Sequence, residues 1–369
     1  MALQSVPAER AGARKLSLEE GFSLQFGGEL DRLEIDFEIW GELNADRSNA
    51  ILICPAFSAH SHARSSPENP EPGWWQGMIG PGKAFDTEHF FVICSSLLGG
   101  GAGTTGPLSI NLRTGREYAG DFPIVSIRDI VRVQARLLRF FGIERLYAAA
   151  GGSMGGMEVL ELLTREAPAC DRGLVLSATA RTQSYTATIR HVGRRAIMLD
   201  PAFKGGFYGE HPPRQGLKLA REVGTMYYRS REDFNGRFSC APITTPSLDG
   251  ITFDFQSYLD HMGNKILTTF DANAYLRLSM AMDLHDVSRG FDSLDQALRR
   301  IPGQVMVMGV EQDPLIPIDE QQDLLEALEK AGVRTQWHSL SSPFGHDAFL
   351  KEFDWLTPRV RRFLEVMER

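Results

Sequence analysis

Short apolar runs recur along the chain with the length and residue types of buried β-strands. A run of five to eight residues that is apolar nearly throughout is typical of a strand covered on both faces in a parallel sheet. Isoleucine, valine and phenylalanine, which favour strands, are frequent in these runs. We therefore predict strands over residues 33–41, 50–57, 90–99, 145–152, 173–179, 304–310 and 335–340.

Helical periodicity separates many of these runs. Segments 126–142, 319–332 and 357–369 place apolar residues three and four positions apart, as an amphipathic helix requires. Strands that alternate with helices indicate a mostly parallel sheet joined by right-handed crossover connections. The predicted fold class is therefore α/β.

The alternation stops over residues 185–300, where helical periodicity and turn residues occur without a convincing buried strand. This stretch could be a helical lid inserted between two strands of one sheet, or a separate domain. No linker rich in Pro, Gly or Ser flanks it, which favours the insertion. We predict a flexible lead-in over residues 1–20, a core formed by 21–184 and 301–369, and the lid over 185–300.

Composition and charge restrict the class of protein. The chain is 43% hydrophobic and 23% charged, and no apolar run approaches the length of a membrane span. A net charge of −8 without a basic block argues against nucleic acid or an anionic membrane as a partner. The four cysteines form no closely spaced pair, and the N-terminus lacks the apolar region of a secretory signal. We expect a cytoplasmic protein that acts on small molecules.

A serine lies at the centre of a glycine cluster that follows the run at 145–152. The segment "GGSMG" at 151–155 fits the pattern G-x-S-x-G, between a predicted strand and an amphipathic run. In that context the pattern is typical of a nucleophile elbow, a sharp strand-to-helix turn that exposes a serine hydroxyl above the sheet. Glycines on both sides allow the close backbone approach that such a turn needs. Ser153 is therefore the predicted nucleophile.

A serine nucleophile needs a base and an acid that orients the base, each on a loop after a late strand. The loop after the second-last predicted strand offers Asp313, with Glu311 as the alternative acid. The loop after the last strand offers His346, whereas His338 lies within that strand. Because the order serine, aspartate, histidine is the one that this arrangement requires, we predict that Ser153, Asp313 and His346 are the catalytic residues.

Two backbone amides should bind the oxyanion that forms when the serine attacks. One is expected from Met154, which follows the nucleophile at the start of a helix. The other should lie in the loop after an early strand, "ICPAFSAHSH", and we predict the amide of Phe57. The same loop contains His60 and His62, which lack a carboxylate partner in a metal-binding pattern, so no metal site is predicted.

Longer segments make the chain similar to a known family. They occur in order from about residue 30 onward and include the predicted lid. The segments are "GWWQGMIGPGKAFDTEHFFVICSSLLGG", "GTTGPLSINLRTGREY", "DFPIVSIRDIVRVQARLLRFFGIERL", "GGSMGGMEVLE", "GLKLAREVGTMYYRS", "FQSYLDHMGNKILTTFDANAYL" and "GHDAFL". The sequence resembles the homoserine O-acetyltransferase family of acyltransferases, which implies the α/β-hydrolase fold with a mostly parallel sheet and an inserted helical lid.

The resemblance implies a role for each matching residue. Ser153 takes the acyl group from acyl-CoA, His346 transfers protons, and Asp313 orients His346. Arg221 in the lid binds the carboxylate of the amino acid and Asp347 binds its ammonium group, which suits the forked guanidinium and the negative carboxylate. The resemblance implies no permanently bound cofactor, because acyl-CoA is a co-substrate, and it implies a homodimer joined through the lid.

The implied reaction is a ping-pong transfer of an acyl group to L-homoserine in methionine biosynthesis. The loop at residues 55–62 departs from the family pattern, and "MYYRSREDFNGRF" and "DPLIPIDEQQ" are closer to the branch that acylates L-serine, so L-serine is the alternative acceptor. Leu315 stands where succinyl-specific members tend to carry arginine, which favours acetyl over succinyl.

Proteins of two other classes also fit parts of the sequence. An esterase or thioesterase would use the same serine, but it has no need for a pair such as Arg221 and Asp347 that holds an amino acid. A non-catalytic binding protein would not need Ser153, Asp313 and His346 in order. The transferase is therefore the favoured interpretation.

Overall fold

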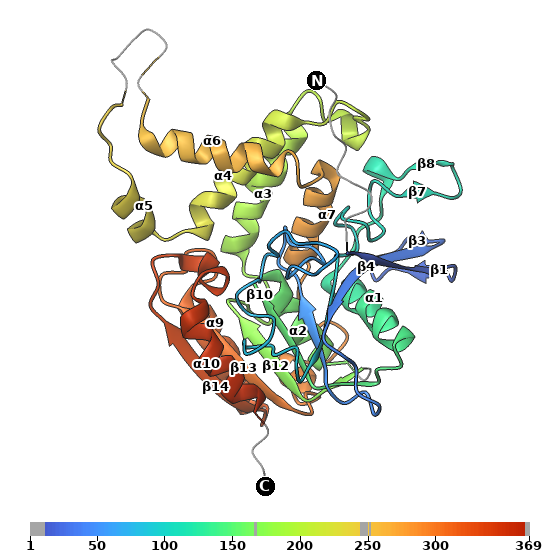
Figure 1. Cartoon of the computed structure of the whole chain (residues 1–369). Helices are drawn as coiled ribbons and strands as arrows, with labels where there is room; N and C mark the ends of the chain where they lie inside the picture. The colour runs from blue at the N-terminus through green and yellow to red at the C-terminus, as the bar shows by residue number, and fades with distance from the viewer. Residues whose placement is uncertain (1–11, 166–167, 244–249, 251, 366–369) are drawn as a thin grey trace.

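The computed structural model describes residues 12–165, 168–243, 250 and 252–365. Its centre is an eight-stranded sheet with the strand order β1-β4-β6-β5-β10-β12-β13-β14 (Figure 1). The strands are β1 (Arg14–Leu18), β4 (Leu33–Trp40), β5 (Ala50–Cys54), β6 (Phe91–Ser95), β10 (Ala148–Gly152), β12 (Arg172–Leu176), β13 (Gln304–Val310) and β14 (Arg334–Leu340).

The sheet is mostly parallel, as predicted. β4 is antiparallel to both β1 and β6, whereas every neighbouring pair from β6 to β14 is parallel. The carboxyl ends of the parallel strands therefore lie at one edge, where the loops that follow them meet. Each predicted strand has a counterpart in this sheet, although the run at 145–152 is divided into a short β9 (Arg145–Leu146) and β10.

Strand β1 corrects the flexible lead-in that we predicted over residues 1–20. Arg14–Leu18 pairs with β4 in an antiparallel register that runs from Arg14 opposite Phe37 to Leu18 opposite Leu33. Of its five residues only Leu16 is buried, so the segment has almost no apolar signal and is placed by backbone hydrogen bonds. Residues 1–11 of the predicted lead-in lie outside the described residues.

Helices cover both faces of the sheet. On one face α1 (Ile127–Phe140), α2 (Met154–Leu163) and α9 (Ile318–Lys330) join an apolar cluster, and on the other α10 (Phe353–Leu364) joins a second cluster. Side chains along β5 alternate between the two, with Leu52 in the first and Ile53 in the second. Because both faces are covered, every residue of β5 is buried, which accounts for its continuous apolar sequence.

A helical insertion separates the neighbouring strands β12 and β13 and lies above the sheet in Figure 1. Amides of Thr182 and Val287 donate to the carbonyls of His285 and Ala180 and close its base. We call helices α3 to α7 the lid; α8 lies inside the predicted lid range but contacts α9 on the core. The helices are α3 (Ser184–Leu199), η2 (Lys204–Gly206), α4 (Arg214–Tyr228), α5 (Arg231–Arg237), α6 (Asp254–Ile266), α7 (Ala272–Asp283) and α8 (Leu294–Leu298).

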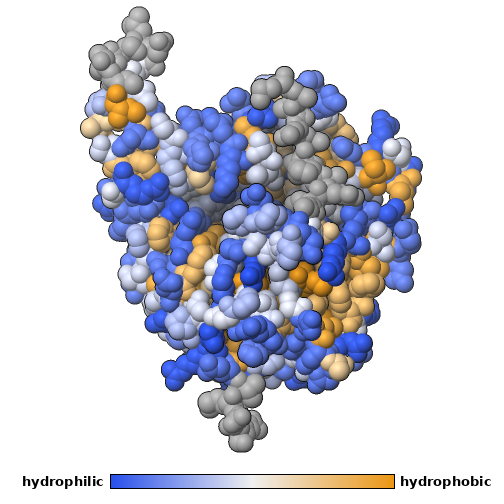
Figure 2. All heavy atoms as spheres, in the orientation of Figure 1, coloured by the Kyte–Doolittle hydropathy of each residue, from blue (hydrophilic) through white to orange (hydrophobic). Residues whose placement is uncertain are grey.

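Shorter elements complete the fold. They are β2 (Phe22–Ser23), β3 (Glu29–Leu30), β7 (Ile110–Asn111), β8 (Arg116–Glu117), β11 (Ala169–Cys170), η1 (Ala119–Asp121) and η3 (Gly345–Leu350). The face seen in Figure 2 is mostly hydrophilic, with hydrophobic residues in scattered patches. Within the described ranges, none of the helices combines the length and apolar character that crossing a membrane requires.

Candidate active site

Ser153 occupies the turn between β10 and α2, and glycines make that turn possible. Its backbone has a φ of +57° and a ψ of −122°, a conformation that residues with a side chain rarely adopt. A Cβ at Gly151 would lie 2.4 Å from the carbonyl carbon of Gly155, and a Cβ at Gly155 would lie 2.2 Å from the carbonyl oxygen of Cys54. Close backbone packing therefore holds the serine in its strained conformation.

The start of helix α2 faces any negative charge that develops beside Ser153. The Ser153 amide donates to the Leu176 carbonyl at 2.9 Å, which ties the turn to the end of β12. Met154 is the first residue of α2, so its amide has no partner within the helix. The first turn contains no acidic residue that would offset the positive end of the helix dipole. Met154 thus stands where the sequence predicts one oxyanion donor.

One hydrogen bond links Ser153 to His346, and a second links His346 to Asp313. Asp313 follows β13 and His346 lies in η3 after β14, as the sequence predicts. His346 Nδ1 is 2.7 Å from Asp313 Oδ2, and His346 Nε2 is 2.7 Å from Ser153 Oγ. A carboxylate can only accept, so Nδ1 carries the proton and Nε2 is free to accept the serine hydroxyl proton. The alternative acid Glu311 instead accepts a hydrogen bond from Ser339 at the surface.

The loop after β13 fixes the orientation of Asp313. Its Oδ1 atom accepts hydrogen bonds from the amides of Leu315 and Ile316, both at 2.9 Å, which leaves Oδ2 for His346. The Leu315 carbonyl in turn accepts from the Thr186 hydroxyl on α3, at 2.9 Å. The acid is therefore held by two backbone donors, and its loop is tied to the lid.

The environment of His346 sets its basicity. Burial alone would lower the pKa of this imidazole, but the Asp313 carboxylate, which also accepts its hydrogen bond, and the nearby Asp347 raise that pKa above its usual value. A higher pKa makes Nε2 a stronger base toward the serine hydroxyl. Phe349 packs edge-on against the ring, with centroids 6.1 Å apart, and limits its rotation.

The loop after β5 lies between the serine turn and the lid. A Cβ at Gly155 would be 3.1 Å from the Pro55 carbonyl oxygen, so this loop runs along the start of α2. The Phe57 ring packs edge-on against Tyr275, with centroids 5.0 Å apart, and against Phe270 at 5.5 Å. These contacts fix the loop at both sides, while the use of the Phe57 amide as an oxyanion donor stays a prediction.

Arg221 and Asp347 both lie close to His346. The guanidinium carbon of Arg221 is 5.2 Å from the centre of the Tyr228 ring, and that ring stacks on His346 with centroids 6.2 Å apart. Asp347 directly follows His346 and pairs with Arg229, whose Nε atom is 3.3 Å from Asp347 Oδ2. The Tyr228 ring therefore lies between Arg221 and His346, and the Asp347 carboxylate lies beside the same histidine.

Known proteins share this architecture over nearly its whole length. A family described as alpha/beta hydrolase fold matches residues 49–353. The homoserine O-acetyltransferase of Symbiobacterium thermophilum is 40% identical to this chain, over 98% of this chain and 96% of its own length. The chain belongs to the homoserine O-acetyltransferase family. It therefore has the α/β-hydrolase fold, as predicted.

Solved structures show that a transferase and an esterase can share this family's fold. A crystal structure of homoserine O-acetyltransferase from Bacillus anthracis matches with a TM-score of 0.91 and 31% identity, covering 97% of this chain and 98% of the other. A structure of esterase E22 matches with a TM-score of 0.89 and 27% identity, covering 96% of this chain and 100% of the other. Within such a fold, side chains in the site decide between transfer and hydrolysis.

Sequence reasoning did not single out Tyr228 and Arg229, although both lie in the segment "MYYRS" that resembles the homoserine O-acetyltransferase family. Tyr228 is the last residue of α4 and Arg229 follows it. An aromatic and a basic residue at a helix end also suit a solvent-facing end of a helix, so the one-dimensional pattern carries no signal. Only their contacts with residues 344–347 reveal their place in the site.

The two histidines of the loop after β5 have structural partners. His62 Nδ1 is 2.9 Å from a carboxylate oxygen of Glu38, and its Nε2 donates to the Glu71 carbonyl at 2.8 Å. The ring of His60 lies beside it, with centroids 6.3 Å apart. In the part of the chain that the structure describes, no group of three or more His, Cys, Asp or Glu side chains could hold a metal ion.

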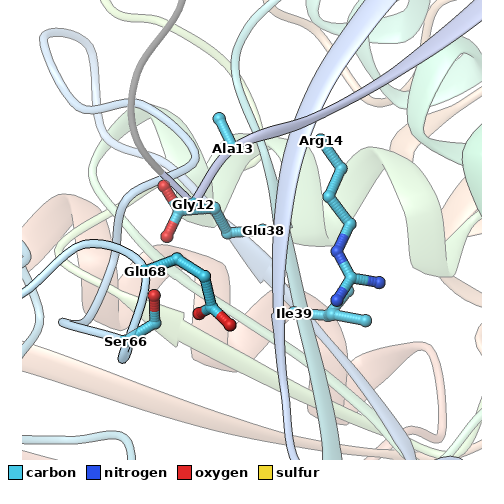
Figure 3. Close-up of a pocket in the computed structure, with 7 residues that line it drawn as sticks. All are labelled: Gly12, Ala13, Arg14, Glu38, Ile39, Ser66 and Glu68. Atoms are coloured by element: carbon cyan, nitrogen blue, oxygen red, sulfur yellow. The ribbon is translucent and has the colours of Figure 1, made fainter.

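A cavity of about 300 Å³ lies near the β1 edge of the sheet, apart from the catalytic residues (Figure 3). β6 and β5 separate β4 from β10 in the sheet, so the cavity beside β1 and β4 is several strands away from Ser153. It contains none of the predicted site residues. Its lining is Gly12, Ala13, Arg14, Glu38, Ile39, Ser66 and Glu68.

Proposed function

We propose that this chain is an acyl-CoA-dependent O-acyltransferase that moves an acetyl group to the side-chain hydroxyl of L-homoserine. The observation that carries the proposal is the line of 2.7 Å hydrogen bonds from Ser153 through His346 to Asp313, with Arg221 and Asp347 beside it. Relatives that are named homoserine O-acetyltransferase support the same acceptor. This reaction belongs to methionine biosynthesis.

In the first half-reaction, the enzyme takes the acetyl group from acetyl-CoA. Ser153 Oγ attacks the thioester carbonyl while His346 Nε2 accepts the hydroxyl proton, and Asp313 stabilises the imidazolium that forms. The amides of Met154 and Phe57 donate hydrogen bonds to the oxyanion. The carbon–sulfur bond then breaks, the departing sulfur takes the proton from His346, and CoA leaves an acetyl ester on Ser153.

In the second half-reaction, the acetyl group passes to the amino acid. His346 removes the proton from the homoserine hydroxyl, whose oxygen attacks the acetyl ester. When the tetrahedral intermediate collapses, O-acetylhomoserine leaves and the Ser153 oxygen regains a proton from His346. Arg221 binds the carboxylate of homoserine and Asp347 its ammonium group, so the hydroxyl is presented to the ester at high effective concentration.

Transfer to an amino acid requires that water does not reach the acetyl ester first. Ser153 is only 8% exposed and His346 only 3% exposed, because the lid and the loop after β5 cover them. A bound amino acid that fills the remaining space keeps bulk water out and favours transfer. This gives the lid a purpose in the reaction beyond carrying Arg221.

A hydrolase is the second candidate function, because esterase E22 has the same fold as this chain. Arg221 and Asp347 argue against hydrolysis, since an esterase has no amino-acid substrate to hold. L-serine is the alternative acceptor within the transferase interpretation. It presents the same carboxylate and ammonium groups, and its side chain is one carbon shorter.

The deciding experiment measures CoA release by the purified protein from acetyl-CoA and from succinyl-CoA. Each donor is tested with L-homoserine, with L-serine and without an acceptor, beside a Ser153→Ala control. We expect release that depends on acetyl-CoA and L-homoserine and disappears in the control. Equal release without an acceptor would show a hydrolase, and release that depends on L-serine would name the other acceptor.

The assembly is a further part of the proposal. We expect a cytoplasmic homodimer joined through the lid, without nucleic acid or membrane partners and without a bound cofactor. Apolar side chains exposed on α3 and α4 support the dimer, since burial of such side chains stabilises an interface: Val192, Leu199, Leu219 and Met226. Light scattering coupled to size-exclusion chromatography tests it, and a monomer at micromolar concentration would contradict it.

A further inference from the structure

The turn at residues 229–230, which joins α4 to α5, packs closely against the loop that carries His346. We call residues 341–350 the histidine loop. The Ser230 hydroxyl donates a hydrogen bond to the Pro343 carbonyl of this loop. A Cβ at Gly345 would lie only 2.8 Å from the Ser230 amide nitrogen, and Gly345 has a φ of +57°. The lid and the histidine loop therefore meet at this turn with almost no free space.

Arg229 fills this junction with a cation. Its Nε atom is 3.3 Å from Asp347 Oδ2, and its guanidinium lies over the Phe344 ring at 5.2 Å. The side chain is 13% exposed, and its Nη1 atom is buried without a hydrogen-bond partner among the described residues. Nη1 also faces the Asp233 carboxylate at 3.8 Å, beyond hydrogen-bond distance. The shortest ionic contact of Arg229 is therefore the one with Asp347.

We propose that Arg229 is a positioning residue that holds the Asp347 carboxylate in place for the ammonium group of the acceptor amino acid. The inference rests on the proposed function, because it assumes that an amino acid binds between Arg221 and Asp347. Arg229 itself does not touch the substrate. It acts through Asp347, and it fixes that side chain relative to both the lid and the catalytic histidine.

The charges around Asp347 explain why the carboxylate needs such a partner. Burial raises the pKa of Asp347 above its usual value, which favours the neutral acid. Arg229 opposes this shift most strongly, followed by His346, by Arg221 on α4, and by Lys351 after the histidine loop. The phenol of Tyr228 also lies within the electrostatic reach of Asp347. Without Arg229, Asp347 would be protonated at a higher pH and would attract an ammonium group less.

Three variants separate a positioning role from a merely structural one. Arg229→Gln removes the cation, and Arg229→Lys keeps a cation in its place. Arg237→Gln is the matched control, because Arg237 also pairs with Asp233, at 3.1 Å, but has no contact with Asp347. Removing Arg237 therefore tests the loss of an arginine from the same acidic neighbour on α5.

The measurement compares two reactions of each variant. Steady-state transfer from acetyl-CoA to L-homoserine gives KM and kcat with the acceptor, and acylation by p-nitrophenyl acetate reports on Ser153 and His346 without an amino acid. In Arg229→Gln we expect the KM for L-homoserine to rise about tenfold or more, with a smaller loss in acylation. We expect Arg229→Lys to recover most of the affinity, and Arg237→Gln to remain within about twofold of the native chain.

The pH profile adds a readout that a loss of packing would not change. In Arg229→Gln, the acid limb of kcat/KM for L-homoserine should move to higher pH, because Asp347 becomes harder to ionise. The acid limb for p-nitrophenyl acetate, which reports on His346, should move less.

A double variant that combines Arg229→Gln with Asp347→Asn also tests whether Arg229 acts through Asp347. Once the carboxylate is gone, Arg229→Gln should not raise KM further.

Opposite results would overturn the inference. If Arg229→Gln and Arg237→Gln have the same KM and pH profile while Ser153→Ala is inactive, the function stands and the positioning role is wrong. If Arg229→Gln raises KM equally with and without Asp347, the residue acts on something other than Asp347. If the native chain shows no L-homoserine-dependent CoA release, the proposed function itself fails. Thermal melts of all variants show whether any loss comes from unfolding.

Discussion

The serine turn is built differently from the proposed acceptor pocket, the place between Arg221 and Asp347 that our proposal assigns to the amino acid. At the turn, glycines let β10, α2 and the end of β5 approach to distances at which a single Cβ would collide with a carbonyl group. In the pocket, Arg221, Tyr228, Arg229 and Asp347 are held by charges and ring stacking. Steric fit is all-or-none over a few tenths of an ångström, whereas charge pairs respond in a graded way to pH, salt and substitution. Steric packing therefore fixes the position of Ser153, whereas the charged residues of the proposed acceptor pocket can respond to changes in pH, salt or sequence.

The largest loss of activity is expected when Asp313 is changed, because its partner His346 lies beside both regions. Asp313→Asn should lower kcat by about 10⁴-fold, because an amide favours the wrong tautomer of the histidine. Without the carboxylate that raises the pKa of His346, that pKa falls, so the acid limb of any residual activity should move to lower pH. Glu311→Gln, on the same loop, is the control and should stay within about twofold of the native rate. If Glu311→Gln lost activity and Asp313→Asn kept it, Glu311 would be the acid that orients His346.

The steric character of the serine turn is tested by Gly155→Ala. The added methyl group would lie 2.2 Å from the Cys54 carbonyl oxygen, so either β5 or α2 must move. A displacement of the serine should reduce activity by about 10²- to 10³-fold, measured as acylation by p-nitrophenyl acetate. Gly236→Ala is the matched control, because a Cβ there would meet no atom within 4 Å beyond its chain neighbours and the backbone of its own helix. Full activity in Gly155→Ala would show that the turn tolerates change.

The graded character of the acceptor pocket is tested by Arg221→Gln. Loss of the guanidinium should reduce kcat/KM for L-homoserine by about 100-fold, mostly through KM, and acylation by p-nitrophenyl acetate should fall far less. Arg214→Gln, an exposed position at the start of the same helix, serves as the control. An equal loss in both reactions would mean that Arg221 supports the serine turn and not the acceptor pocket.

The smallest effect concerns a buried acid behind the serine turn. Glu158 on α2 is fully buried, which raises the pKa of its carboxyl well above the usual value, and it accepts a hydrogen bond from Gln134. Its Oε1 atom and the Oε1 atom of Gln134 have no partner among the described residues. An amide at 158 could donate to Gln134, so Glu158→Gln should add about 1 kcal/mol of stability at pH 8.

The gain from Glu158→Gln should depend on pH in a defined direction. Because the folded state binds the Glu158 proton more tightly than the unfolded state, the native chain loses stability as pH rises through the folded pKa. The gain should therefore shrink toward pH 5 in urea unfolding. Glu161→Gln is the contrasting control, since Glu161 pairs with Arg128 and Arg165 and its loss should destabilise. If Glu158→Gln is less stable than the native chain, the buried site behind the serine turn requires the Glu158 carboxylate.

The sheet and the catalytic line could be predicted because their signals are local. Buried parallel strands have continuous apolar runs, and Ser153 and Asp313 each lie just after such a run. His346 lies in the loop after β14, an edge strand that is only partly buried. Strand β1 could not be predicted, since Leu16 is its only buried side chain. The contact of Arg229 with Asp347 could not be predicted either. It joins two segments that are far apart in the sequence, and the hydrophobic pattern of neither segment shows that they pack together.

The base of the lid has a consequence for the modularity of the fold. Arg181 and Asp286 form an antiparallel bridge, and the amides of Thr182 and Val287 close the ladder on either side of it. The two ends of the insertion are therefore already adjacent, so a tight turn could join them without moving β12 or β13. The lid is therefore a single insertion that enters and leaves the core at one place, and Thr186 and Ser230 tie its far side to the loops that carry Asp313 and His346.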